Sequence, residues 1–262
     1  MFKKNKPKEE IISFIEKYLY FDSKETAKAI YNYFNEQYHY LEIPDSETLL
    51  VERYNSEKHY LIFHSMYGRR VNDALSRALG YLLGRIEGRD VELGISDNNF
   101  YIAGDKMKIE KAIELLKKEK LEDILKEAVE KTDVLARRFR HCATRSLMIL
   151  RNYKGVKRTV GKQQMKSHFL YHAVRKITSE FPILREARRE VLEDLMDIES
   201  AKLVVQWIKE GRVKIKIRET PLPSPFAVNL IIQGHTDLIR IEDKQQFLRR
   251  MHELHMKQIN GE

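Results

Sequence analysis

Cysteine and tryptophan are almost missing from this sequence, which has one of each among its 262 residues. The single thiol, Cys142, excludes an internal disulfide and any zinc site that needs several thiolates, whereas histidine and carboxylate metal sites stay open. No apolar run approaches the roughly 18 residues that a membrane span needs. The first twenty residues mix acids with bases, unlike a secretory or transit peptide. We therefore expect an intracellular, cytoplasmic protein that makes no membrane contact.

Acidic residues are missing from a long internal stretch, because residues 134–179 contain no Asp or Glu. The same stretch holds twelve Lys and Arg residues, more than the net charge of +9 of the whole chain, so the rest of the sequence is slightly acidic. A concentrated basic tract of this kind is typical of a surface that binds a polyanion. The alternative is a solvated face whose charge is balanced by carboxylates from other segments.

Hydrophobic periodicity predicts an α+β fold. Residues 48–54 and 59–64 read as a β-hairpin, "DVELGISDNNFYIAG" reads as a second one, and residues 213–218 alternate like a late strand. We expect the early hairpins and the late strand to form a small β-barrel-like sheet with a large helical insertion. The expected organisation is N-terminal helices at 1–44 and a single α+β unit at 45–262, divided into a β-rich part (45–104), a helical part (105–211), a β return (212–240) and a closing helix (241–262).

The basic tract begins on a segment, residues 134–151, that reads as one amphipathic helix. Leu135, Phe139, Cys142, Ala143, Ser146 and Leu150 fall on one face of it and the arginines on the other. The planar fork of arginine suits bidentate phosphate contacts, and the following "NYKGVKRTVGK" is a basic loop with an aromatic ring available for stacking on a base. The predicted nucleic-acid contacts are Arg137, Arg138, Arg140, His141, Thr144, Arg145, Arg151, Tyr153, Lys154, Lys157, Arg158 and Lys162, together with Arg69 and Arg70.

Several polar residues would also suit an enzyme. His64, Asp73, His168 and His172 could form a catalytic or metal-binding group, but the sequence does not place them together. The string "HFLYH" has Phe169 where the zinc metalloprotease motif needs a glutamate. We therefore predict no catalytic residue and no metal site.

Other conspicuous residues read as structural. Ser224 lies between two prolines whose fixed φ suits a rigid turn, and Trp207 and Cys142 lie among apolar neighbours. Pro182 predicts the start of a further helix. The charged residues of that helix read mostly as an exposed ladder with helical spacing, formed by Glu186, Arg189, Glu190 and Glu193.

Several long strings, taken in order, resemble one protein family. They are "VERY", "FHSMYGRRVNDALSRALGYLLGR", "SDNNFYI", "ARRFRHCATRSLMILR", "FPILREARREVLEDLMDI" and "IKEGRVKIKIRETPLPSPF". Together they resemble the carboxy-terminal core domain, often termed the DEAD/DEAH-associated domain, of the large helicase-related (Lhr) superfamily 2 helicases. The resemblance runs from about Asp22 to Leu230, and its motifs "RFRxxAxRxLxxLR", "FPIxxExxRExLxDxxD" and "PSPF" are long and specific.

The resemblance implies a domain that follows two RecA-like motor domains and a winged helix in an ATP-dependent helicase, which moves 3′ to 5′ along single-stranded nucleic acid. Such a domain combines β-barrel-like and helical parts and grips the tracking strand. The implied partners are single-stranded DNA or RNA, and the motor and winged-helix domains in the same chain or in a separate subunit. The alternative is a stand-alone nucleic-acid-binding protein that shares this domain.

Two features depart from a complete helicase of this family. The sequence contains neither "GxxxxGK[ST]" nor "DExH", the strings that supply the phosphate cradle and the metal-binding acid of the motor. We therefore expect no ATP hydrolysis by this chain alone and no cofactor in it, since ATP and Mg²⁺ would bind the absent motor. Bacterial relatives commonly carry a tryptophan just after the "GxRV" turn, thought to contact a base, whereas this sequence has "NDALS" there, with Leu75 nearest by position. The base-wedging role that the resemblance implies at that turn is therefore not carried over to this sequence.

Overall fold

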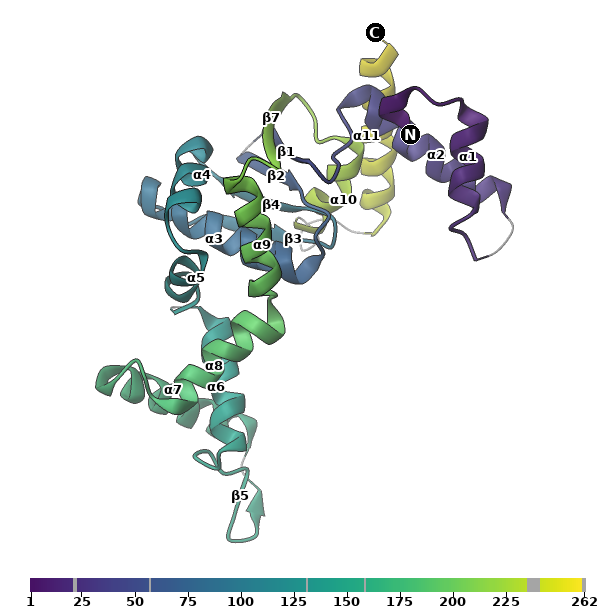
Figure 1. The fold of residues 1–262 in the computed structure, drawn as a ribbon. Coiled ribbons are helices and arrows are strands. Elements are labelled where there is room, and N and C mark those ends of the chain that lie inside the picture. Colours follow the sequence, from purple (N-terminus) through teal and green to yellow (C-terminus); the bar gives the residue numbers. More distant parts are fainter. Residues whose placement is uncertain (21–22, 57, 131, 158, 235–240, 261–262) are drawn as a thin grey trace.

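The computed structural model describes residues 1–262 apart from 21–22, 57, 131, 158, 235–240 and 261–262. Two N-terminal helices lead into a β-rich body, a long helical stretch follows, and a late strand returns to the body (Figure 1). The helical segments are η1 (Phe2–Lys4), α1 (Lys8–Glu16), α2 (Lys24–Tyr40), α3 (Arg69–Glu87), α4 (Ile109–Lys118), α5 (Leu121–Glu130), α6 (Asp133–Arg145), α7 (Val160–Ile177), α8 (Pro182–Arg189), the π-helical η2 (Glu190–Leu195), α9 (Ile198–Lys209), α10 (Pro225–Gly234) and α11 (Ile241–Asn260). The strands are β1 (Thr48–Asn55), β2 (His59–His64), β3 (Glu92–Ile95), β4 (Phe100–Gly104), β5 (Asn152–Tyr153), β6 (Val156–Lys157) and β7 (Lys214–Thr220).

Five strands form one open sheet in the order β3-β4-β2-β1-β7. β1 pairs antiparallel with β2, with Leu50 opposite His64, and β4 pairs antiparallel with both β2 and β3. β7 pairs parallel with β1, as a strand can after a long helical crossover. The early hairpins and the late strand are therefore confirmed. The barrel-like closure is not found, because within the described residues β3 and β7 are opposite edges of the sheet and do not pair.

Helices cover both faces of this sheet, which explains why it stays open. In β2, Leu61 and Phe63 face the main core with α3, whereas Tyr60 and Ile62 face a second apolar cluster with α10. A strand buried on both faces reads as a continuous apolar run, as "YLIF" does. The sheet thus buries its apolar side chains against helices and does not need to close on itself.

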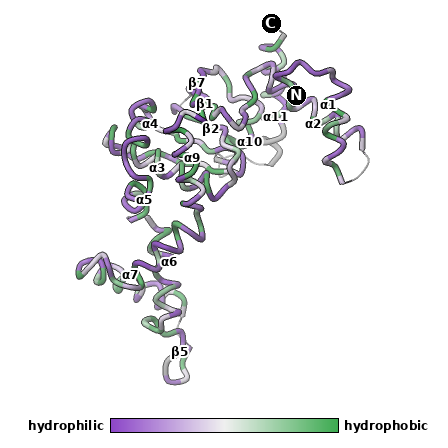
Figure 2. Tube along the Cα trace, viewed as in Figure 1, coloured by the Kyte–Doolittle hydropathy of each residue, from purple (hydrophilic) through white to green (hydrophobic). Residues whose placement is uncertain are grey.

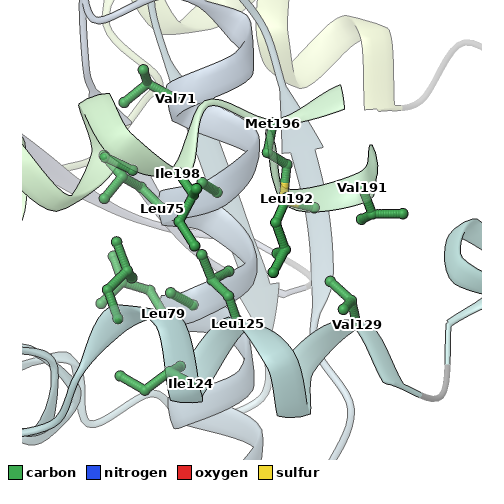
Figure 3. Close-up of a cluster of buried hydrophobic side chains, with 14 of the residues drawn as sticks. Val71, Leu75, Leu79, Ile124, Leu125, Val129, Val191, Leu192, Met196 and Ile198 are labelled. Carbon is green, nitrogen blue, oxygen red and sulfur yellow. The ribbon is translucent and has the colours of Figure 1, made fainter. Parts of the chain in front are cut away.

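The larger core joins the sheet layer to the helical part of the chain. Figure 3 shows α3 side chains facing those of α5, η2 and α9 across this core. The labelled contacts are Val71, Leu75 and Leu79 from α3, Ile124, Leu125 and Val129 from α5, and Val191, Leu192, Met196 and Ile198 from the segments that follow α8. The β-rich part and the start of the helical part therefore share one hydrophobic core.

The β return expected at 212–240 is wrong beyond β7, because Pro225–Gly234 forms a helix, α10; residues 235–240 lie outside the described part. Pro225 has the fixed φ of a first helical position, and the carbonyl oxygen of Ser224 accepts bonds from the amides of Ala227 and Val228. α10 contacts the sheet on one side and α2 and α11 on others. Among its described residues only Asn229 and Gln233 are exposed, a polar stripe too narrow to mark a surface helix in the sequence.

The segment from α6 to α8, residues 133–189, projects from the body and is termed the arm (Figure 1). Within it α6 packs on α7 through Phe139 and Tyr171, whose ring centroids lie 5.2 Å apart, and also on α8. Figure 2 shows hydrophobic residues recurring along the arm as well as in the body. The buried apolar residues of the arm therefore continue the main core of the body, while much of the arm's length is open to solvent.

The helix expected over residues 134–151 is shorter, because α6 ends at Arg145. Leu147 has a φ of 60°, in the left-handed region, and the amide of Ile149 reaches back to the carbonyl of Ala143. Leu150, expected on the apolar face, is exposed, and Arg151 leads into the β5–β6 hairpin instead of lying on the helix. A leucine at the left-handed position carries no glycine signal, so the periodic pattern extended past the true helix end.

Candidate nucleic-acid interface

The arm presents many basic side chains to solvent. Among the described residues, these basic side chains of the acid-free tract have no carboxylate within ion-pair distance: Arg137, Arg140, Arg151, Lys157, Lys162, Lys166 and Lys176. They come from α6, the β5–β6 hairpin and α7 in succession. Unpaired cations on neighbouring elements sum to a positive surface potential. The charge of this tract is therefore not balanced, over most of its described length, by carboxylates from other segments.

A cleft of about 620 Å³ lies between α6 and α7 and is termed the arm cleft. Arg137 and Arg140 line it from α6, and Met165 and His168 line it from α7. Asp133, at the start of α6, is the one acidic residue among the lining side chains. Guanidinium groups at the edge of a groove suit phosphate oxygens, and the side chain of Met165, 62% exposed, offers apolar surface to a base.

The positive charges of this surface help to lower the pKa of His141. The pKa of its imidazole is lowered, first by partial burial and then by the charges of Arg140, Arg138, Arg145 and Arg151. A lowered pKa keeps the ring neutral at pH 7, since the ordinary value is already about 6.5. His141 therefore offers a hydrogen bond at this surface and adds no further charge.

Two of the predicted contacts pair with a carboxylate of η2, next to the arm. Arg138 and Arg145 both bond the carboxylate of Glu190, which is 5% exposed, and the Arg138 Nη1 to Glu190 Oε2 distance is 3.4 Å. The prediction that Glu190 belongs to an exposed ladder of charges is therefore wrong, although Arg189 does pair with neighbouring carboxylates. Glu190 follows the buried Ala187 by three residues and so shares its inward helix face. Arg175, in α7, is also paired, at 3.2 Å from Glu130.

Three further candidates donate to main-chain carbonyls. The hydroxyl of Thr144 lies 2.8 Å from the carbonyl oxygen of Arg140, so its proton is used within α6 and it is not the free donor that we expected. In the body, Arg69 donates to the carbonyl of Ile95 at 3.0 Å. Arg70 donates to the carbonyls of Glu193 and Met196, at 2.5 and 3.1 Å. Arg70 thereby connects α3 to the end of η2, so it has a structural task at the base of the arm.

The basic loop after α6 is a β-hairpin with a two-residue turn. Asn152 of β5 pairs with Lys157 of β6, and the turn residues Lys154 and Gly155 have φ values of 50° and 80°. Two successive positive φ values are typical of a type I′ turn, for which glycine is well suited. Lys154 and Lys157 are exposed on this hairpin. The side chain of Tyr153 and the whole of Arg158 lie outside the described residues, so their contacts stay predictions.

The residues considered for an enzyme lie in three separate places. Asp73 pairs with Arg77 on α3, the Nε2 atoms of His168 and His172 lie 3.0 Å apart on α7, and His64 bonds a carboxylate in the sheet. In the part of the chain that the structure describes, no group of three or more His, Cys, Asp or Glu side chains is placed to hold a metal ion. The four residues therefore do not form one catalytic group.

The residues interpreted as structural are buried or half-buried. Burial raises the pKa of the Cys142 thiol to about 11, so it stays protonated and unreactive at neutral pH. Ser224 is fully buried, and the ring of Trp207 is half-buried under the guanidinium of Arg212, 5.4 Å from the ring centroid. None of the described helices is both long enough and apolar enough to cross a membrane.

Exposed apolar side chains on the arm are a feature that the sequence reasoning missed. Phe169 is 70% exposed on α7, and Leu147 and Val156 are similarly exposed around the hairpin. A signal was present in α7, because Ser167, Tyr171 and Val174 form its buried side and their spacing places Phe169 on the opposite side. The surface of the arm is therefore both basic and apolar, a combination that suits phosphates together with bases.

Comparison with known proteins shows that this chain is similar to part of several helicases. The chain is 46% identical over 261 residues to the ATP-dependent helicase Lhr-Core of Methanothermobacter thermautotrophicus, covering 98% of this chain and 30% of the relative. It is 40% identical over 195 residues to the ATP-dependent helicase Lhr-Core of Sulfolobus acidocaldarius, covering 73% of this chain and 22% of the relative. The chain thus spans less than a third of the length of these relatives.

A solved structure is also similar, the Mycobacterium smegmatis helicase Lhr bound to ssDNA and AMP-PNP. It matches with a TM-score of 0.70 and 28% identity, covering 79% of this chain and 27% of the helicase. The family model described as DEAD/H associated matches residues 43–227, from the loop before β1 into α10. This match takes in the sheet, the arm and the helices that join them. The chain therefore belongs to the DEAD/H associated family, whose resemblance was already carried by its own sequence strings.

Proposed function

We propose that this chain is the strand-binding part of an Lhr-type ATP-dependent helicase, which grips one strand of DNA or RNA with its arm. RecA-like motor domains and a winged helix would be supplied by the same polypeptide or by a separate subunit. ATP and Mg²⁺ would bind that motor and not this chain. In this proposal the chain binds the strand, and the motor domains move along it.

The unpaired cations of the arm are the observation that carries the proposal. Arg137 and Arg140 lie at the arm cleft, and Arg151, Lys157 and Lys162 continue along the hairpin and α7. Their charges have no carboxylate partners among the described residues, so an approaching phosphate meets donors that need not break an existing ion pair. Displacement of counterions from the strand would then supply much of the binding free energy.

The exposed apolar side chains favour a single strand over a duplex. In a duplex the faces of the bases are stacked on each other, whereas a single strand can present them to a protein side chain. Phe169 and Met165 are exposed on the same helix as the cations of α7. Stacking of this kind tolerates any base, so we expect the arm to show little sequence preference. The Lhr helicase of M. smegmatis, solved with ssDNA, supports the choice of a single strand.

A salt titration tests the proposal directly. We expect affinity for a single-stranded oligonucleotide to fall steeply between about 50 mM and about 200 mM salt, with a log–log slope of about −0.7 for each phosphate contacted. The same titration on duplex DNA and on single-stranded RNA of matched length shows which nucleic acid is preferred. Equal affinity at both salt concentrations, or tighter binding of the duplex, would exclude the proposed function.

A further inference from the structure

A second cleft lies in the body, among α2, the turn between β3 and β4, and α10. It has a volume of about 380 Å³ and is termed the His64 cleft. Its lining includes His64, the rings of Tyr33 and Phe226, and the carboxamides of Asn98 and Asn229. In Figure 1 α10 and β3 lie well away from α7 and β5. The His64 cleft is therefore separate from the arm cleft and is not part of the surface described above.

His64 is a buried polar side chain that lines this cleft. It is 2% exposed, and its Nε2 lies 3.0 Å from Oε2 of Glu52, whose side chain is fully buried. The other oxygen of Glu52 accepts from the amide of Ser224 at 2.6 Å and from the hydroxyl of Thr220 at 2.9 Å. Glu52 is thus surrounded by donors from the sheet and from the loop before α10. Its carboxylate is consequently occupied by the protein and is not available to a ligand.

The hydrogen bond to Glu52 fixes the orientation of the His64 ring. A carboxylate only accepts hydrogen bonds, so Nε2 of His64 donates to Glu52, and Nδ1 is the ring nitrogen left for another partner. Nδ1 makes no hydrogen bond to another described residue. A carboxylate that sets the tautomer and orientation of an imidazole is a common way of preparing the other ring nitrogen for a partner. His64, which lines the cleft, thus has a second ring nitrogen with no partner among the described residues.

Aromatic and amide groups also line the cleft. The ring centroids of Tyr33 and Phe226 lie 4.9 Å apart, and the hydroxyl of Tyr33 donates to the carbonyl of Pro225 at 3.2 Å, which holds the ring in place. Tyr33 nevertheless stays 40% exposed. Asn98 and Asn229 are exposed, and neither side chain bonds another described residue. The walls therefore offer a flat apolar surface and two amides, each with a donor and an acceptor.

The charge of the lining selects the chemistry of the ligand. No Lys, Arg, Asp or Glu is among the residues that line the His64 cleft. The cleft therefore has no permanent charge to pair with a phosphate or an ammonium group, in contrast to the arm cleft. A flat, neutral heterocycle that carries donors and acceptors on its edge matches a ring surface, two carboxamides and an imidazole nitrogen.

We propose that the His64 cleft binds one unstacked nucleobase, with its ring against Tyr33 and its edge bonded to His64 Nδ1 and to the carboxamides of Asn98 and Asn229. The inference rests on the proposed function for the source of the base, which would be the bound single strand. A base held here would be read by hydrogen bonds, whereas the arm holds phosphates without regard to sequence. The two clefts would therefore hold one strand at two points by different chemistry.

Free nucleosides test the cleft without involving the arm, because they carry no phosphate. We expect adenosine, guanosine, cytidine or thymidine to shift the NMR signals of His64 and of the Asn98 and Asn229 side-chain amides. The double variant Asn98→Ala with Asn229→Ala should weaken the binding at least several-fold, and the variant Gln206→Ala should leave it unchanged. Gln206 is a matched carboxamide exposed on α9, where it bonds Glu210. Absence of shifts at these residues with all four nucleosides would overturn the proposal.

Oligonucleotides test whether the base comes from the strand. We expect an oligonucleotide of abasic sites to bind the wild type about 5- to 100-fold more weakly than the same length with bases. The double variant should show a smaller difference between the two oligonucleotides, and Gln206→Ala the full one. Single-strand binding without nucleoside shifts would overturn the base site and leave the proposed function standing. If nucleosides shifted these signals but the protein bound no single strand, the base site would stand and the proposed function would be overturned.

Discussion

Arg138 of α6 lies with its Nη1 3.4 Å from Oε2 of Glu190, a carboxylate that is 5% exposed at the start of η2. Arg145, about two turns further along α6, bonds the other oxygen of the same carboxylate. One buried acid from outside the acid-free tract thus holds two of its arginines at the junction of α6 with η2. The arginines that pair with Glu190 are therefore distinct from those that have no carboxylate partner among the described residues.

Removing one of these arginines should destabilise the fold. Arg138→Ala leaves Glu190 buried with one donor fewer, and we expect the free energy of unfolding to fall by roughly 1–3 kcal/mol. Urea denaturation measures this change. The double variant Arg138→Met with Glu190→Leu should recover part of the loss, because no charge is then left buried and Arg145 can turn to solvent.

Arg137→Ala is the matched control for this experiment. Arg137 is the adjacent residue on α6, is exposed, and has no carboxylate partner among the described residues. Its removal should change the stability by less than about 0.5 kcal/mol. Equal losses for Arg137→Ala and Arg138→Ala would show that the Glu190 pairing contributes nothing.

The unpaired arginines of the arm cleft should matter for binding and not for stability. Arg137→Gln with Arg140→Gln removes two candidate phosphate-binding groups, so the log–log salt dependence of single-strand binding should become shallower by about 0.7 for each phosphate that is no longer neutralised. Affinity at low salt should fall accordingly, which fluorescence anisotropy on a labelled oligonucleotide measures. The melting temperature should stay nearly constant.

A second double variant separates local contacts from net charge. Arg85→Gln with Arg89→Gln makes the same change in net charge on the body, where these arginines bond Glu119 and Asp105. Binding should change little in this variant, since the carboxylates already compensate the charges that it removes. If both double variants weakened binding equally, the arm cleft would have no special role.

The stability of the C-terminal helix should depend on pH through His255. This residue of α11 is 2% exposed and lies 2.7 Å from the carbonyl of Pro223, and burial is the main cause that lowers its pKa. The unfolded chain takes up the proton near pH 6.5, whereas the folded protein does so only at lower pH. Acidification below about pH 6.5 therefore favours the unfolded state, and the effect is absent at alkaline pH.

His255→Gln removes this titration and keeps a side-chain donor. The melting temperature of the wild type should fall more than that of the variant between about pH 7.5 and about pH 5.5. The comparison between the two proteins cancels the contribution of the carboxylates that they share. Parallel pH profiles would mean that His255 does not titrate differently in the folded protein.

Local signals explain what could be predicted from the sequence. The hairpin of β1 and β2 and the start of α8 at Pro182 both depend on neighbouring residues, and both are found. The acid-free tract likewise indicated the basic surface of the arm. These features need no knowledge of which distant segment packs against which.

Features that depend on distant packing could not be predicted in the same way. Helical spacing shows that Glu190 has neighbours at i+3 and i+4, but not that α6 covers its face. α10 is covered on several sides and so shows only a narrow polar stripe, formed by Asn229 and Gln233. Glu52 and His64 are twelve residues apart on two strands, and only the register of β1 with β2 brings them together. The sheet stays open because helices cover it, which the strand pattern alone does not reveal.

Adding one methyl group at Gly94 in β3 should destabilise the protein. It is opposite Tyr101 of β4, and a Cβ at Gly94 would overlap the Tyr101 ring. That ring is held in place, because Tyr101 is 2% exposed and its hydroxyl donates to Glu92 at 2.7 Å. Gly94→Ala must therefore displace either the ring or the edge strand, and we expect a loss of roughly 1–3 kcal/mol.

Gly104→Ala tests whether this loss comes from the ring and not from glycine in a strand as such. A Cβ at Gly104, at the end of β4, would meet its nearest neighbour at 3.6 Å, which is an ordinary contact. The change in stability there should be small, since no side chain has to move. Thermal unfolding of both variants measures the difference. If the two substitutions cost the same, Tyr101 would be free to move aside, and the fixed position that we infer from its burial and its bond to Glu92 would be wrong.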